Sequence, residues 1–143
     1  MLGCSINGTN ELEFGKEKFS ENKSDFIFLK EYIERAYFKN SKFKDLERID
    51  FYNCFNDKKS FPNQICDSIL SEKMYEIGIN EISLQKGLYD QLSEIHFVLK
   101  EDYQYKSVTI QYLSHFNTSE WAMESRNFKA IILQDNWLLV VEN

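Results

Sequence analysis

The chain has 143 residues, of which 43% are hydrophobic, 28% charged and 15% aromatic, with five glycines and one proline. This length and composition suit one domain that needs no metal to fold, and they exclude a repeat array or a long flexible linker. The net charge of −6, with lysines interleaved among acids, argues against nucleic acid and favours either a plain acidic surface or a partner with a basic surface.

The first five residues, Met1-Leu2-Gly3-Cys4-Ser5, resemble the lipobox that ends the signal peptide of bacterial lipoproteins. Leu2 and Gly3 fit the two positions before the lipidated cysteine. Met1 stands where a leucine is usual, and the apolar region that normally precedes the motif is missing. The resemblance implies a lipid on Cys4, which would be the chain's one membrane contact, and a location in the cell envelope or periplasm. Without the motif, the expected location is the cytoplasm.

Residues 5–23 are polar and lack a helical or strand period. Such a segment would suit a tether between a lipid and a folded domain. We therefore expect residues 1–23 to form a polar extension and residues 24–143 to form a single domain.

The next part of the chain predicts helices. Apolar side chains recur at helical spacing over residues 24–37, and a weaker helical pattern follows over 43–49. Residues 50–59 combine aromatics with turn formers and predict a loop. A third helix should begin after Ser60, with Pro62 in its first turn. Its predicted buried stripe is Ile65, Cys66, Ile69, Leu70 and Met74.

The last third of the chain predicts strands, because short segments rich in Ile, Val, Leu and aromatics alternate with polar turns. These segments are Glu94–Lys100, Ser107–Leu113, Asn127–Leu133 and Trp137–Glu142. Residues 79–84 suggest a fifth short extended segment, with a helix as the alternative. The sequence therefore predicts an α+β fold, with about three N-terminal helices packed on a C-terminal antiparallel sheet of four to five strands.

The predicted strands differ in how many of their faces are apolar. The first two alternate, and their wetter face carries His96, Thr109 and Gln111. The last two are apolar on both faces. A helix, a lipid-like ligand or another subunit should therefore cover the second face of the sheet.

Helices followed by a sheet whose last hairpin reads Asp135-Asn136-Trp137-Leu138-Leu139-Val140-Val141 resemble the NTF2-like domains. The resemblance implies helices packed into the concave face of the sheet, a pocket there, and often dimerisation through the other face. It carries over no catalytic residues. A cystatin-like helix on a sheet, or an unrelated α+β sheet, would give the same pattern.

Motifs of catalysis are missing from the sequence. It has no Gly-rich phosphate loop, no HExxH, no GxSxG and no clustered metal ligands, so we expect no metal and no cofactor and disfavour an enzyme. His96 is the natural candidate for a general base, and Thr109 and Gln111 could line a pocket with it. A single histidine in a strand is, however, more often structural.

One predicted loop, residues 115–124, combines aromatic and methionine side chains with acids. Phe116, Trp121 and Met123 are residue types enriched at binding surfaces, which makes this loop a candidate interaction site. The alternative is that Trp121 folds back to cap the core.

If Cys4 carries a lipid, Cys54 and Cys66 remain as a pair. In an oxidising compartment they could form a disulfide, and closing a loop of this length would contribute roughly 3 kcal/mol. The alternative is two buried free thiols.

Two functions are compatible with these features. The first is a non-enzymatic envelope-associated protein that binds another protein with a basic surface, such as an immunity-type lipoprotein. The second is an NTF2-like small-molecule-binding domain or enzyme with a pocket near His96, which predicts a homodimer. We favour the first, because it requires no residue whose role is unassigned.

Overall fold

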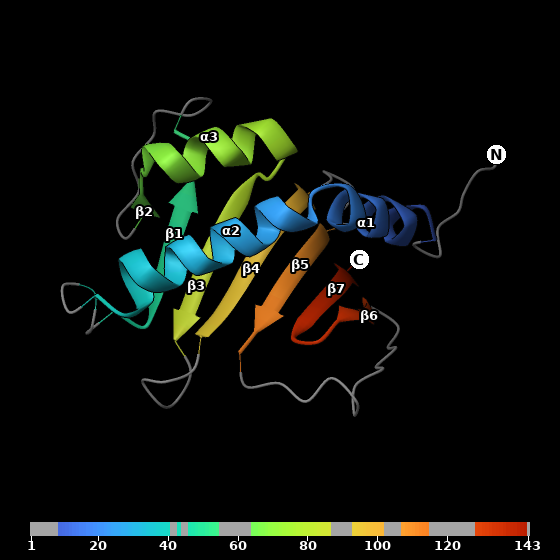
Figure 1. The fold of residues 1–143 in the computed structure, drawn as a ribbon. Coiled ribbons are helices and arrows are strands. Elements are labelled where there is room, and N and C mark those ends of the chain that lie inside the picture. Colours follow the sequence, from blue (N-terminus) through green and yellow to red (C-terminus); the bar gives the residue numbers. More distant parts are fainter. Residues whose placement is uncertain are drawn as a thin grey trace.

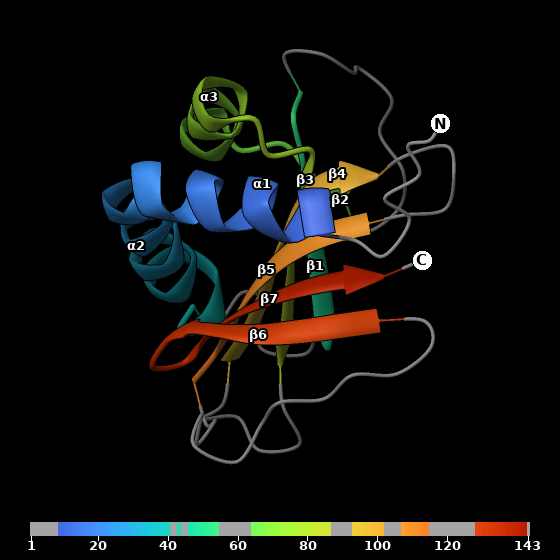
Figure 2. The same cartoon turned by 90° about the vertical axis from the view of Figure 1, so that its right-hand side faces the viewer.

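The computed structural model describes residues 9–40, 43, 46–54, 64–86, 93–101, 107–114 and 128–142. Within them the chain has an α+β fold, in which three helices lie on one face of a single sheet (Figures 1 and 2). The helices are α1 (Thr9–Glu21), α2 (Lys23–Ile33) and α3 (Ser68–Ile77), and α2 continues into a π-helical turn, η1 (Glu34–Phe38).

The sheet has seven strands in the order β2-β1-β3-β4-β5-β7-β6. Six of them are antiparallel, and the two-residue strand β2 pairs parallel to β1. The strands are β1 (Arg48–Tyr52), β2 (Gln64–Ile65), β3 (Glu81–Lys86), β4 (Ser93–Glu101), β5 (Ser107–Leu113), β6 (Phe128–Gln134) and β7 (Trp137–Glu142).

The predicted α+β class is confirmed, but the predicted count of four to five strands is wrong. The additional strands are β1 and β2, which lie where the sequence suggested helical and loop segments. Ile49 and Phe51 are buried while their neighbours in β1 are not, so this segment has the period of a strand. The helices are also not all N-terminal, because α3 follows these two strands.

Residues 9–21, expected to belong to a tether, instead form helix α1, which contacts β5 and β7. Phe19 enters the core. A Cβ atom added to Gly15 would lie 2.4 Å from Cδ1 of Leu139, so the helix approaches β7 more closely than a larger residue would allow. The apolar positions of α1 are few, which is why its period is hard to see in the sequence. Residues 1–8, with Cys4, lie outside the described part.

The helices pack on the sheet through a group of aromatic side chains. Phe26 of α2 is fully buried, with ring centroids 5.4 Å from Phe97 and 6.3 Å from Trp137. Phe19 of α1 adds a third helix-to-sheet contact, 5.2 Å from Trp137. Such aromatic pairs contribute burial and also favourable ring geometry. They hold α1 and α2 against the centre of the sheet.

Helix α3 begins later than predicted because Asp67 caps it. The Oδ1 atom of Asp67 accepts hydrogen bonds from the backbone N–H groups of Ile69 and Leu70, at 2.9 and 3.1 Å. The Oδ2 atom accepts the phenol protons of Tyr32 and Tyr37. Burial and these bonds raise the pKa of Tyr32 to about 12 and raise the pKa of Tyr37 further. One carboxylate therefore fixes α3 to both α2 and η1.

The edge of the sheet is also joined to α3. Cys54, which follows β1, and Cys66, which precedes α3, form a disulfide with Cα atoms 5.7 Å apart. The hydroxyl of Ser71, a buried residue of α3, donates to the carbonyl of Tyr52 and accepts from the backbone N–H of Cys54. These contacts connect the last residues of β1 to the first turn of the helix.

Candidate functional site

We use the term outer face for the side of the sheet opposite the three helices (Figure 2). Polar side chains form a row on this face, because the register aligns one from each of four neighbouring strands. Asp50 of β1 pairs with Ser83 of β3, Ser83 with His96 of β4, and His96 with Gln111 of β5. Directly paired side chains have Cβ atoms roughly 4.5–5.5 Å apart, so the row is continuous.

His96 has a carboxylate partner on its own strand. Its Nε2 atom lies 2.7 Å from Oε1 of Glu94, two residues earlier and therefore on the same face. The His96 side chain is 22% exposed and the Glu94 side chain 31%. A carboxylate at this distance fixes the orientation of the imidazole ring. The pair offers a partner molecule an oriented ring rather than a mobile one.

Ser83 lies opposite His96, but it is poorly placed to act as a nucleophile. The residue is 3% exposed, and its hydroxyl oxygen is buried without a hydrogen-bond partner among the described residues. A nucleophilic hydroxyl needs both a base within hydrogen-bond reach and access for the substrate. The row of polar side chains therefore suits recognition better than covalent catalysis.

Carboxylates outnumber cationic groups on the outer face. Strand alternation places Asp50, Glu81, Glu94 and Glu142 there, and the guanidinium of Arg48 pairs with Asp50 at 2.9 Å. Counting only side chains that the structure describes, the four carboxylates on the outer face outnumber its one guanidinium, so the face is acidic. An acidic face attracts and orients a basic partner.

The β7–β6 end of the outer face is apolar. Leu113, Ala130, Leu138 and Val140 form a small buried cluster, separate from the main core. Beside them Ile132 is 41% exposed. This arrangement explains why β6 and β7 have apolar residues on both faces: one set packs under the helices and the other joins this second cluster.

The three residues predicted near a pocket do share one surface. His96 and Gln111 are directly paired, and Thr109 lies on the same face, next along β5. They lie on the outer face and not between the helices and the sheet. The other predicted binding residues, Phe116, Trp121 and Met123, lie outside the described residues. Among the residues that are described, no group of three or more metal-ligating side chains occurs.

The sequence alone did not identify Asp50 and Ser83 as members of the polar row. The turn formers of residues 50–59 predict a loop at Asp50, although the alternation of Ile49 and Phe51 around it is a strand signal. Ser83 stands between Ile82 and Leu84 in the segment that suggested a short extended element. The pairing of both residues with His96 depends on strand order, which local patterns do not reveal.

Comparisons of the chain with protein-family models, with curated proteins and with solved structures find no match. In the part of the chain that the structure describes, no helix is long and apolar enough to cross a membrane.

Proposed function

We propose that this protein binds another protein through its outer face and that the contacting surface of the partner is basic. The excess of carboxylates on that face carries the proposal. Asp50 is the first member of the polar row, Glu81 and Glu94 lie beside the row, and Glu142 adds a carboxylate at the end of β7. Charge of one sign on a binding surface accelerates encounter with an oppositely charged partner and rejects partners of the same charge.

The two halves of the outer face have different roles in this proposal. The row from Asp50 to Gln111 supplies hydrogen-bonding groups that fix the orientation of the partner. Ile132, at the apolar end, supplies exposed hydrocarbon that becomes buried on binding. Protein interfaces combine an apolar centre with polar groups in this way.

We further propose that the protein acts in the cell envelope, in the manner of an immunity-type lipoprotein. The Cys54–Cys66 disulfide supports this location, since such bonds persist in oxidising compartments. The lipobox-like residues up to Cys4 would supply a lipid anchor. These proposals need no catalytic group, and the buried Ser83 hydroxyl agrees with that.

The proposed binding is tested by reversing charge on one face at a time. The purified protein is immobilised and exposed to an envelope extract of the cells that produce it, and the retained proteins are identified by mass spectrometry. The double variant Glu81→Lys and Glu94→Lys should bind the retained basic protein about tenfold more weakly than the unchanged chain. Raising the salt concentration should also weaken binding of the unchanged chain, because salt screens the attraction between the acidic face and the basic partner.

The matched control is the double variant Glu13→Lys and Glu17→Lys on α1, because it makes the same change in net charge on exposed residues of the helical side. It should bind as the unchanged chain does. Equal losses in both variants would show that net charge alone matters and would contradict a site on the outer face. Retention of no protein other than a second copy of this chain would replace the proposal with a homodimer.

A further inference from the structure

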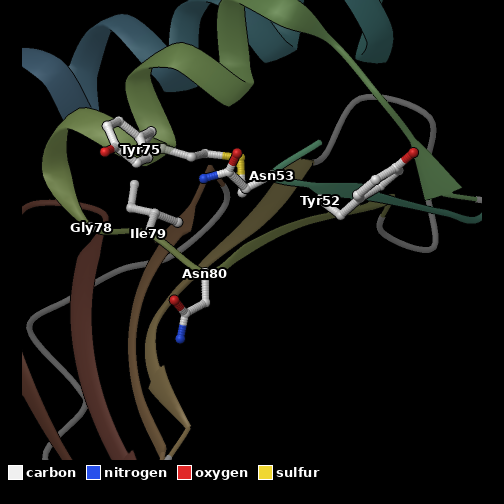
Figure 3. A pocket seen from close by; sticks show the side chains of 7 residues that line it. Tyr52, Asn53, Tyr75, Gly78, Ile79 and Asn80 are labelled. Carbon is white, nitrogen blue, oxygen red and sulfur yellow. The ribbon is translucent and has the colours of Figure 1, made fainter. Parts of the chain in front are cut away.

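The two sulfur atoms of the Cys54–Cys66 disulfide lie in different surroundings. Cys66 precedes α3 and is exposed, whereas Cys54 follows β1 and is half-buried. Figure 3 shows Asn53, the residue before Cys54, which is itself buried and lines a pocket beside α3. The bond therefore has one side that a molecule can reach from solvent and one side that lies against α3.

The sulfur of Cys54 also has a hydrogen-bond donor beside it. Its Sγ atom lies 2.9 Å from the hydroxyl oxygen of Ser71, a fully buried residue of α3. The same oxygen accepts the backbone N–H of Cys54 at 3.2 Å, and the bonded sulfur has no proton of its own to donate. The Ser71 proton is therefore shared between this sulfur and the carbonyl of Tyr52, which lies 3.3 Å away.

This asymmetry determines the direction of thiol–disulfide exchange, in which a thiolate attacks one sulfur and expels the other. The attacked sulfur must be accessible, and the expelled sulfur leaves faster when its thiolate is stabilised. Access favours attack at Cys66. Hydrogen bonds to a charged acceptor are stronger than those to a neutral one, so the Ser71 hydroxyl stabilises a Cys54 thiolate more than it stabilises the disulfide. Both features select the same direction of cleavage.

We propose that Cys66 is a modification site at which a low-molecular-weight thiol forms a mixed disulfide. The thiolate of that molecule attacks Sγ of Cys66, a new S–S bond forms, and the bond to Cys54 breaks. The electron pair leaves with Sγ of Cys54, which then takes up a proton from solvent. One S–S bond replaces another, so no external oxidant or reductant is consumed. Attack of the Cys54 thiolate on Cys66 reverses the step and expels the added thiol.

The modified residue lies at the edge of the sheet. It follows β2 directly, and Gln64 of β2 pairs with Asp50, the first member of the polar row. Opening the bond leaves this two-residue strand without its covalent link to the end of β1. The exchange chemistry requires no protein partner, so this inference is independent of the proposed function.

The experiment uses the oxidised chain with the Cys4 thiol alkylated beforehand. The chain is treated briefly with the neutral thiol mercaptoethanol, and the released thiols are then capped with methyl methanethiosulfonate. Mass spectrometry of peptides that separate the two cysteines identifies which one carries mercaptoethanol. In the folded chain the adduct on Cys66 should exceed the adduct on Cys54 by at least about tenfold. In concentrated guanidinium chloride, where both sulfurs are accessible, the two adducts should differ by less than about twofold.

Two variants test the hydroxyl of Ser71. Ser71→Ala should slow the exchange of the folded chain about fivefold, because the Cys54 thiolate loses a hydrogen-bond donor. Ser68→Ala makes the same change at an exposed residue in the first turn of α3 and should leave the rate unchanged. An unchanged or faster rate in Ser71→Ala would overturn the role of this hydroxyl.

Three results would overturn the modification site itself. The folded chain could give equal adducts on the two cysteines or an excess on Cys54. It could form no adduct at thiol concentrations that open the unfolded chain. An equal preference for Cys66 in guanidinium chloride would show that the fold does not select this sulfur.

Discussion

Phe97 and His96 are neighbours in β4 but lie on opposite faces of the sheet, and the two faces are built differently. The face under the helices carries most of the core, with Phe26 of α2 packed against the rings of Phe97 and Trp137. The outer face combines a polar row with the apolar cluster around Leu138. The comparison shows that strand alternation separates the two faces residue by residue: one face packs against the helices, and the other carries the polar row beside a second, smaller apolar cluster.

Replacing each of the two neighbours with alanine tests this comparison most directly. Phe97→Ala should lower the free energy of unfolding by about 3–5 kcal/mol, because it leaves a cavity in the fully buried aromatic group. His96→Ala should cost less than about 1 kcal/mol, since it removes a partly exposed contact with Glu94. Urea unfolding measured by circular dichroism distinguishes the two. Similar losses in both variants would contradict the division between the faces.

The attachment of the helical layer to the sheet edge depends on a covalent link as well as on packing. Replacing Cys54 and Cys66 together with alanine should lower the free energy of unfolding by about 3 kcal/mol, because the unfolded chain is no longer constrained by the closed loop. Unfolding of the oxidised and reduced forms of the unchanged chain measures the same effect. Reductant should not change the free energy of unfolding of the double variant, because that variant has no disulfide to reduce. If reductant leaves the unchanged chain equally stable, the disulfide contributes nothing to the attachment.

A smaller and pH-dependent effect should come from the bonds at Asp67. In the unfolded chain a tyrosine ionises near pH 10, whereas the folded protein holds the protons of Tyr32 and Tyr37 to higher pH. The stability that these tyrosines contribute is therefore fully present below about pH 10 and is lost as the pH rises above it. Tyr37→Phe should cost about 1 kcal/mol at pH 7 and make the decline above pH 10 shallower.

Urea midpoints measured between pH 7 and 11 check this expectation. Tyr75→Phe alters an exposed tyrosine and serves as the control, with an alkaline profile like that of the unchanged chain. If the free energy of unfolding falls equally steeply above pH 10 in the unchanged chain and in Tyr37→Phe, groups other than the Tyr37 hydroxyl cause the fall.

Much of the C-terminal sheet could be predicted from the sequence because its signals are local. Strands β5 and β7 have the predicted bounds, and β4 and β6 differ from prediction by one residue at each end. The alternation of Ile95 and Phe97 with His96 identified the two faces of β4. Each of these inferences depends only on side chains a few residues apart, which the period of a strand relates directly.

The remaining features depend on residues that are distant in sequence, so only the tertiary structure could determine them. The segment from Arg48 to Tyr52 is a strand because β3 pairs with it, and α1 is a core helix because Gly15 allows it to approach β7. The polar row on the outer face likewise requires the register of four strands. Sequence alone determined which side chains point to the same side of each strand. Strand order and helix docking, which arise from long-range burial, decided which of those side chains meet.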